Sequence, residues 1–288
     1  MRSGPDFMCI GLQKAGTGWL YDQLDGHPDF EMPPVKELHY FNRGLQPLPL
    51  KKLQRLLDQG LDEANNWRAR RRRRLLSAAD VDFLRRARAV RDGAGGIDDY
   101  AMLFGYEGLT GDITPAYSTL GAEEVQRIAR RFPGMKVVLL LREPASRAAS
   151  HLGMMADFGH FPPEALESVA RVADWFAREQ VQERSRPSVI WKRWSAAVPP
   201  EQIRYFFFED LCDRPDWLRS EIVSFLGGDS TKPIPLPPAF NRKGPGRTRT
   251  PDAVRAYLAK ELREEILACA ELFGGHAANW ARSALEPA

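Results

Sequence analysis

Short apolar runs alternate with helix-length amphipathic segments along much of the chain. Residues 7–11, 136–141 and 203–208 are apolar with little polar alternation, a pattern typical of strands buried on both faces of a parallel sheet. Apolar positions at helical spacing predict helices near residues 19–24, 123–131, 144–152, 190–197, 216–226 and 252–273. Strands separated by helices predict βαβ units, so we expect an α/β fold with a central, mainly parallel sheet flanked by helices.

Two regions depart from this alternation. Residues 45–104 contain no convincing strand and carry many arginines, which predicts a helical, Arg-rich insertion. A proline-rich connector at 233–238 precedes Arg242-Lys243-Gly244. Because no linker is long enough to divide the chain, we expect one domain over residues 1–288.

Composition narrows the protein class. The 288 residues are 43% hydrophobic and 27% charged, which argues against a disordered chain. Lys+Arg 41 against Asp+Glu 38 leaves +3, so no polycationic character suggests a nucleic-acid partner. The three cysteines, Cys9, Cys212 and Cys269, form no CxxC pair, and the five histidines form no metal-binding motif, so we expect neither disulfides nor a metal. Without an apolar run of membrane-spanning length or a secretory leader, the chain is expected to be cytoplasmic, with no transmembrane segment.

The loop from Gln13 to Trp19 joins the first predicted strand to its helix and contains Lys14, Gly16, Thr17 and Gly18. Backbone N–H groups at a helix N-terminus, with glycines that permit close approach, form an anion site. The loop is not a Walker A motif, because its lysine precedes the glycines and no hydroxyl residue follows the lysine. An ordinary strand–helix turn with an exposed lysine remains the alternative.

Three motifs in order resemble the sulfotransferases that use 3′-phosphoadenosine-5′-phosphosulfate (PAPS), closest to their heparan-sulfate-type and bacterial branch. Lys14-Ala15-Gly16-Thr17-Gly18-Trp19 is similar to the 5′-phosphosulfate loop, with Gln13 in place of its leading proline. Arg142-Glu143-Pro144 with Ser150 resembles the 3′-phosphate segment, and Arg242-Lys243-Gly244 resembles the loop that closes over that phosphate. The resemblance implies a P-loop-like three-layer domain that takes PAPS as co-substrate.

The donor contacts implied by this resemblance come from all three motifs and from the end of the third strand. They are Lys14, Ala15, Gly16, Thr17, Gly18, Trp19, Arg142, Ser150, Phe208, Arg242, Lys243 and Gly244. Phe208 stands where another branch has tyrosine, so we expect Trp19 to be the better platform for the adenine ring.

The acceptor side is represented by Lys36-Glu37-Leu38-His39-Tyr40-Phe41, which resembles the segment carrying the catalytic glutamate of the heparan-sulfate-type branch. Sulfuryl transfer to an alcohol requires removal of the hydroxyl proton and positive charge at the leaving oxygen. The resemblance therefore implies Glu37 as general base, Lys14 as the electrophile at the leaving oxygen, and His39 as a group that orients Glu37 or contacts the acceptor. A surface salt bridge for Glu37 and a merely packed His39 are the alternatives.

A second segment of the acceptor side, residues 111–117, resembles that branch's E-K-S-P-A-Y sequence. Asp112 and Ile113 replace its glutamate and lysine, which removes a cation near the acceptor. We therefore expect a glycan or a small alcohol as the hydroxyl-bearing acceptor, without preference for a highly sulfated chain, and an amine acceptor is also open.

Ten arginines and no lysine lie between Arg68 and Arg91. They indicate either the solvated face of a long helix, buried through Leu75, Leu76, Val81, Phe83 and Leu84, or a docking face for an anionic acceptor. Two rival functions stay open: a P-loop-type nucleotide-dependent phosphotransferase, which would use the glycine loop, and a non-catalytic module that binds anions or nucleic acid through the arginine run.

Overall fold

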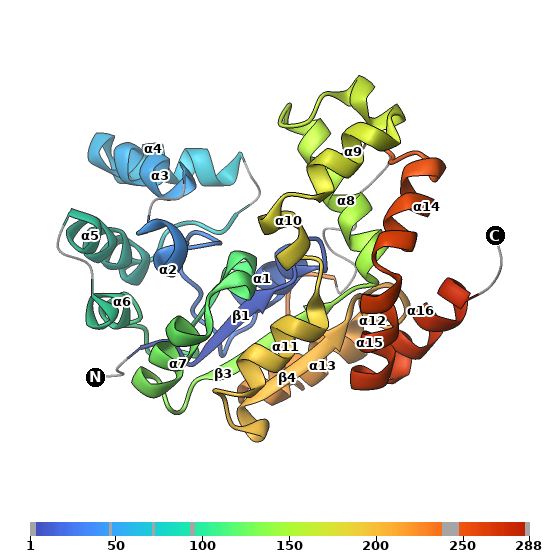
Figure 1. The fold of residues 1–288 in the computed structure, drawn as a ribbon. Coiled ribbons are helices and arrows are strands. Elements are labelled where there is room, and N and C mark those ends of the chain that lie inside the picture. Colours follow the sequence, from blue (N-terminus) through green and yellow to red (C-terminus); the bar gives the residue numbers. More distant parts are fainter. Residues whose placement is uncertain (1–3, 46–47, 71–72, 93–95, 238–247, 286–288) are drawn as a thin grey trace.

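A computed structural model describes residues 4–45, 48–70, 73–92, 96–237 and 248–285. Its centre is a four-stranded sheet, entirely parallel, in the order β2-β1-β3-β4. The strands are β1 (Phe7–Gly11), β2 (Gly111–Ile113), β3 (Lys136–Leu141) and β4 (Ile203–Phe207). The three apolar runs thus form strands as predicted, and the α/β class with a parallel sheet is confirmed (Figure 1).

Helices cover both faces of this sheet. In the sheet order, the connection from β1 to β2 runs in one direction across the sheet, whereas those from β2 to β3 and from β3 to β4 run in the other. Because such crossovers are right-handed, the helices of the first connection lie on one face and those of the other two on the opposite face. In keeping with this, α1 contacts α13, whereas α7 contacts α11. These four helices are α1 (Thr17–Asp25), α7 (Ala122–Arg131), α11 (Pro187–Ser195) and α13 (Pro215–Leu226).

The Arg-rich region between α1 and β2 is helical, as predicted. It forms a separate group beside the sheet in Figure 1. Its helices are α2 (Tyr40–Arg43), α3 (Leu48–Gln59), α4 (Leu61–Ala69), α5 (Ala78–Asp92) and α6 (Ile97–Met102). Phe83 and Leu84 of α5 are buried, which fixes the inner face of this group.

The remaining helices follow β3 and β4. After β3 come α8 (Pro144–Asp157), η2 (Pro163–Glu167), α9 (Val169–Phe176) and α10 (Glu179–Glu183), and η3 (Pro200–Gln202) precedes β4. After β4 come α12 (Phe208–Asp213), α14 (Asp252–Glu261), α15 (Arg263–Phe273) and α16 (Gly275–Leu285). Among the described residues, no helix is both long and apolar enough to cross a membrane.

Two local predictions were wrong or incomplete. The predicted helix over 252–273 is two helices, because α14 ends before Leu262 and α15 begins at Arg263. The strand β2 was missed, since its three residues, Gly111-Asp112-Ile113, do not form an apolar run. A β-carbon on Gly111 would lie 2.5 Å from the Phe7 carbonyl oxygen, so close pairing of β2 with β1 requires glycine at position 111.

Candidate active site

The motifs predicted from sequence follow the carboxyl ends of neighbouring parallel strands. The glycine loop follows β1, Thr114 follows β2, Arg142 follows β3 and Phe208 follows β4. In open α/β sheets ligands bind at this edge. The fold therefore brings together side chains that lie up to two hundred residues apart in the sequence.

The glycine loop leaves the beginning of α1 open to an anion. Gly16 is the N-cap residue, with φ 100, and no side chain caps the helix. A β-carbon on Gly16 would lie 2.8 Å from Leu211 Cδ2, whereas one on Gly18 would meet nothing within 4 Å. Because no described side chain caps the helix, the first N–H groups of α1 can donate to a phosphate or sulfate.

Three residues of the glycine loop are buried in the protein. They are Ala15, Thr17 and Trp19, and Trp19 is only 4% exposed. The indole of Trp19 therefore packs in the core, and its role as an adenine platform stays a prediction.

Arg142 is tied to the glycine loop rather than to its neighbour in sequence. Its Nη1 donates to the carbonyl oxygen of Lys14 at 3.0 Å, and its guanidinium lies 4.4 Å from the ring centre of Phe208. Burial lowers the pKa of Arg142, which Glu209 partly offsets. Glu143 instead caps α8 through the N–H groups of Ala145 and Ser146. Lys14, Arg142 and Phe208 thus form one group, while Ser150 lies farther along α8.

Glu37 is held between the side chains of Lys36 and His39. Its Oε1 lies 2.6 Å from Lys36 Nζ, and its Oε2 lies 3.2 Å from His39 Nε2. Burial alone would raise the pKa of Glu37, but the hydrogen bonds and charges of His39 and Lys36 lower it to about 2. Glu37 is therefore ionised at neutral pH. The other ring nitrogen of His39 lies 3.1 Å from Asn42 Oδ1, so the ring is fixed from both sides.

A buried carboxylate positions this segment. Asp112 is 1% exposed and accepts hydrogen bonds from the hydroxyl groups of Tyr100, Thr114 and Tyr117 at 3.1, 2.6 and 2.8 Å. Its pKa is raised by burial, although these donors favour the charged form.

Two of these hydroxyl groups also accept hydrogen bonds from the segment that carries Glu37. Tyr117 accepts from the Tyr40 N–H at 2.9 Å, and Thr114 accepts from the His39 N–H at 3.5 Å. Asp112 is therefore a positioning residue, too deeply buried to meet an acceptor itself.

Positive backbone angles mark the three residues predicted to be catalytic. Lys14 has φ 74, Glu37 has φ 63 and His39 has φ 57. Only one further non-glycine residue in the described part of the chain, Leu45, has a positive φ. Such conformations cost free energy and concentrate at functional sites, so these outliers point to the same positions as the motifs.

Two arginines and a histidine that the sequence analysis missed border this group. Arg147 is fully buried, and its Nη2 donates to Ser185 Oγ at 2.6 Å, while Nε and Nη1 have no partner in the described structure. Burial, with Arg184, lowers the pKa of Arg147 to about 9. Burial, with Arg147, Arg184 and Lys14, lowers the pKa of His151 to about 3. Burial, with Arg43, lowers the pKa of Arg184, and the charge of Glu37 partly offsets this effect. Arg184 thus interacts electrostatically both with Glu37 and with Arg147 of α8.

The arginine run divides into two parts. On α5, the exposed Arg85 pairs with Asp82 and the half-buried Arg88 pairs with Asp58, as expected for a solvated helix face. Leu75, however, is 59% exposed rather than buried, which corrects one of the positions expected to face the core.

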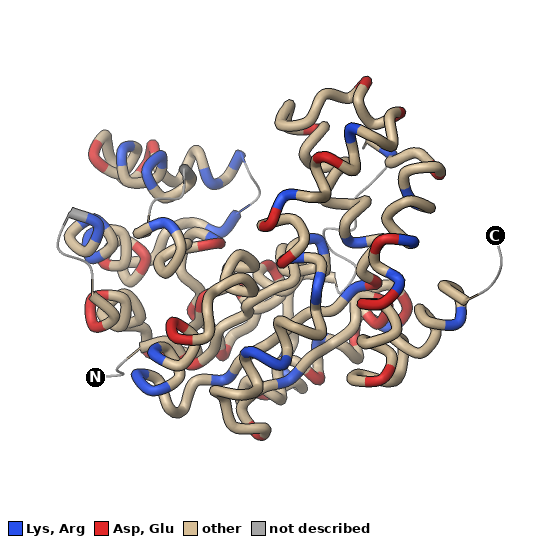
Figure 2. Tube along the Cα trace, in the orientation of Figure 1, with Lys and Arg blue, Asp and Glu red and all other residues tan. Residues whose placement is uncertain are grey.

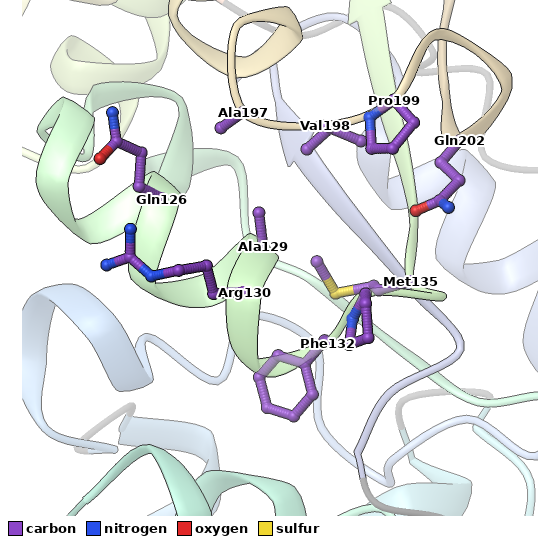
Figure 3. Close-up of a pocket in the computed structure, with 10 residues that line it drawn as sticks. Gln126, Ala129, Arg130, Phe132, Met135, Ala197, Val198, Pro199 and Gln202 are labelled. Carbon is purple, nitrogen blue, oxygen red and sulfur yellow. The ribbon is translucent and has the colours of Figure 1, made fainter.

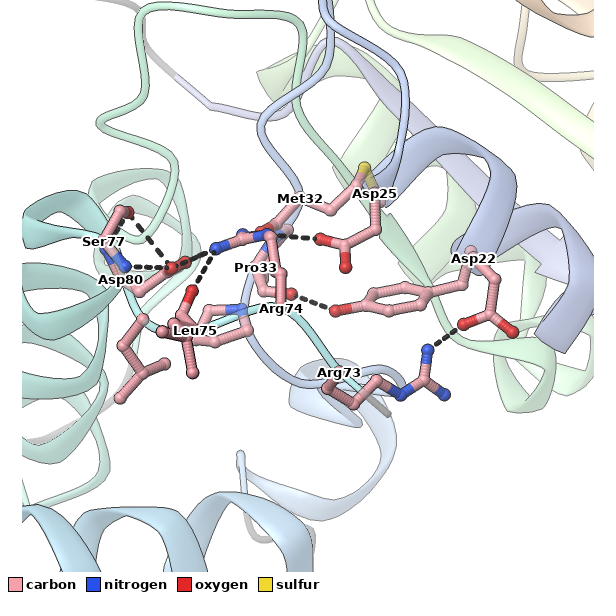
Figure 4. A network of polar contacts seen from close by, with 12 residues as sticks. Asp22, Asp25, Met32, Pro33, Arg73, Arg74, Leu75, Ser77 and Asp80 are labelled. Carbon is pink, nitrogen blue, oxygen red and sulfur yellow. Dashed lines mark hydrogen bonds and ion pairs between the residues drawn. The ribbon is translucent and has the colours of Figure 1, made fainter. Parts of the chain in front are cut away.

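The first part of the run is turned inward. Arg74 pairs with Asp25 at 2.9 Å and also with Asp80, while Arg73 pairs with Asp22 (Figure 4). These arginines join the insertion to α1. Neither a long solvated helix nor an open docking face describes this segment.

Charge over the rest of the molecule is mixed, with basic and acidic positions interspersed along most helices (Figure 2). Within the described residues, no three His, Cys, Asp or Glu side chains gather in an arrangement that could hold a metal ion. Arg242, Lys243 and Gly244 lie outside the described residues. The chain on either side of them contacts α1 and α8: Pro237 O accepts from Gln23, and Thr250 donates to Ala149 O.

A cavity of about 240 Å³ lies away from this site (Figure 3). It is lined by Ala129 and Phe132 at the end of α7, by Met135 before β3 and by Val198 and Gln202 before β4. These positions precede the strands, so the cavity lies at the amino edge of the sheet, opposite the ligand-binding edge.

Comparisons with known proteins give one family. The model described as "Sulfotransferase family" matches residues 5–232. A search of curated proteins finds no match. Among solved structures, a sulfotransferase from Alicyclobacillus acidocaldarius has a TM-score of 0.63 at 20% identity, covering 96% of this chain and 98% of that one. The sulfotransferase domain of the curacin biosynthetic pathway has a TM-score of 0.46 at 17% identity, covering 89% and 83%. The first likeness supports the fold.

Proposed function

Because the chain belongs to the sulfotransferase family, we propose that it transfers a sulfuryl group from PAPS directly to a hydroxyl-bearing acceptor, a glycan or a small alcohol. The observation that carries this proposal is the meeting of Lys14, Arg142 and the uncapped start of α1 at the carboxyl edge of the sheet. That arrangement combines backbone donors and two cations, which suits a ligand with two anionic groups.

The donor would lie across this edge. The N–H groups at the start of α1 and Lys14 would bind the 5′-phosphosulfate, while Arg142 and Ser150 would bind the 3′-phosphate. Phe208 would lie beside the adenosine, with the guanidinium of Arg142 already on its ring. The anchored flanks of Arg242–Gly244 support a role for that segment at the same phosphate.

Glu37 would act as the general base. As the acceptor oxygen forms a bond to sulfur, its proton passes to Glu37, and the bond from sulfur to the bridging phosphate oxygen breaks. Adenosine 3′,5′-bisphosphate leaves with that electron pair, and Lys14 neutralises the charge on the leaving oxygen. His39 orients the carboxylate, and Lys36 keeps it ionised. No covalent enzyme intermediate and no metal is needed.

The cations missed by sequence reasoning fit the same scheme. The transferring sulfuryl group carries negative charge. Arg184 lies near enough to Glu37 that the charge of Glu37 partly offsets the lowering of the Arg184 pKa by burial. We expect Arg184 to stabilise the transition state, while the deeper Arg147 adds positive charge behind it and the neutral His151 packs beside them.

Glu37→Gln tests the proposed base. The amide keeps the shape of the side chain but cannot accept the proton, so transfer from radiolabelled PAPS to a panel of alcohols and glycans should fall about 10²–10⁴-fold. Binding of adenosine 3′,5′-bisphosphate should be retained. Asp82→Asn is the matched control, because Asp82 is an exposed carboxylate on α5. It should leave both the transfer rate and the bisphosphate affinity unchanged. Full transfer by Glu37→Gln would contradict the assignment.

A further inference from the structure

A basic cavity lies beside the segment that precedes Glu37. It has a volume of about 430 Å³ and lies between α1, the segment before Glu37, α3 and α4. Tyr21, Val35 and Trp67 give it apolar walls. This volume falls in the range of small-molecule sites, about 300–1,000 Å³.

One wall carries an arginine that is not fully paired. Arg68 is 1% exposed, with its Nη1 donating to Pro34 O and its Nε donating to Arg74 O. Its Nη2 is buried and has no hydrogen-bond partner in the described structure. A buried guanidinium N–H without a hydrogen-bond acceptor costs free energy, so Arg68 keeps hydrogen-bonding capacity for a ligand oxygen that reaches this nitrogen.

The charged residues that line the cavity are all basic. Lys36, Lys52 and Arg73 join Arg68 there, and no carboxylate is among the described lining residues, although Lys36 pairs with Glu37 and Arg73 pairs with Asp22 beside the cavity. A cavity with four cationic side chains and apolar walls suits an anionic group attached to an apolar body.

The cavity is joined to the proposed base through Lys36. The ammonium group of Lys36 contacts Glu37 Oε1 at 2.6 Å, and the same side chain lines the cavity. A molecule seated against Arg68 would therefore extend toward Glu37.

We infer that this cavity binds the acceptor, and that the acceptor is a small hydroxylated molecule with an apolar body and one carboxylate, which Arg68 and Lys52 hold while its hydroxyl group meets Glu37. The inference rests on the proposed function for the role of the hydroxyl group. The cavity's preference for an anion stands on its lining alone.

The experiment compares acids with their neutral amides. The probes are 4-hydroxybenzoate, 4-hydroxyphenylacetate and 3-(4-hydroxyphenyl)propanoate, each beside its primary amide. Their affinities are measured by calorimetry on the full chain, with and without adenosine 3′,5′-bisphosphate. We expect at least one acid to bind about tenfold or more tightly than its amide, because a hydrogen bond to a charged group is lost in the amide.

Lys52→Glu then tests where the acid binds. Lys52 is exposed on α3, so its reversal should leave the fold intact while weakening the acid about tenfold. Arg55→Glu is the matched control, since Arg55 is exposed on the same helix but does not line the cavity, and it should change the affinity less than about twofold.

Three results would overturn the inference: equal affinity for acids and amides, no binding by any probe, or equal effects of the two charge reversals. Failure of the proposed function would be seen separately, as an absence of bisphosphate binding in the same titrations. A preference for acids that persists without bisphosphate binding would keep the anion site and remove its link to sulfuryl transfer.

Discussion

The Tyr117 hydroxyl group joins two hydrogen bonds in the network that holds the Glu37 segment, and Tyr117→Phe removes that atom alone. The hydroxyl donates to Asp112 Oδ2 at 2.8 Å and accepts from the Tyr40 N–H at 2.9 Å. Tyr117 is fully buried, so water does not replace the lost partner.

The expected cost follows from these two bonds. A hydrogen bond to a charged group contributes about 1.5–3 kcal/mol and a neutral one about 1 kcal/mol, so we expect a loss of about 2–4 kcal/mol in the free energy of unfolding. For a chain of this size that lowers Tm by on the order of 5–10 °C. Because the Tyr40 N–H follows the segment carrying Glu37 and His39, kcat should also fall by about tenfold or more, with bisphosphate affinity unchanged.

Tyr106→Phe is the matched control. Tyr106 is 5% exposed, and its hydroxyl group has no hydrogen-bond partner in the described structure, so its removal should leave Tm unchanged or higher. Tm is measured by calorimetry and kcat by sulfate transfer for both variants. Equal Tm and kcat in the two variants would refute the positioning role of the Asp112 network.

Three other predictions concern pH, stability and the missed cation. Since Lys36 helps to lower the pKa of Glu37 to about 2, the pH profile of kcat/KM should show no acid limb from Glu37 above about pH 4. Lys36→Met should move that limb to higher pH. An unchanged profile in this variant would contradict the pairing of Lys36 with Glu37. The stabilising effect of this pairing is present above the unfolded-state pKa of Glu37 and is lost as pH falls toward 2. Arg74→Met leaves two buried aspartates unpaired and should cost about 3 kcal/mol of unfolding free energy, whereas Arg85→Met, at an exposed pair, should change it by less than about 0.5 kcal/mol in denaturant titrations. Arg184→Gln should lower kcat and leave bisphosphate affinity unchanged, and the reverse result would place Arg184 at the donor.

The predictable part of this structure is the part encoded locally. Buried parallel strands need continuous apolar runs, so β1, β3 and β4 could be recognised, and the loops after them could be assigned as site segments. The strand β2 has three residues and contains Asp112, whose burial depends on hydroxyl groups from two other elements. No local pattern marks such a carboxylate as a positioning residue.

The arginines show the same limit. A run of like charges predicts exposure, yet Arg73 and Arg74 meet Asp22 and Asp25 about fifty residues earlier in the chain. Arg184, which follows α10, feels the charge of Glu37, which lies about 150 residues earlier in the chain. Long-range ion pairs and shared electrostatic fields follow from tertiary structure, and sequence spacing alone does not contain them.

The most direct test of the account is thermal unfolding with adenosine 3′,5′-bisphosphate, compared with ATP and magnesium. At 100 times its dissociation constant a ligand adds about 2.7 kcal/mol, which raises Tm by several degrees. We predict a rise with the bisphosphate, greatly reduced in Arg142→Ala, and little or none with ATP and magnesium. A rise with ATP and magnesium alone, or no rise with either ligand in folded protein, would contradict a PAPS site at the carboxyl edge of this sheet.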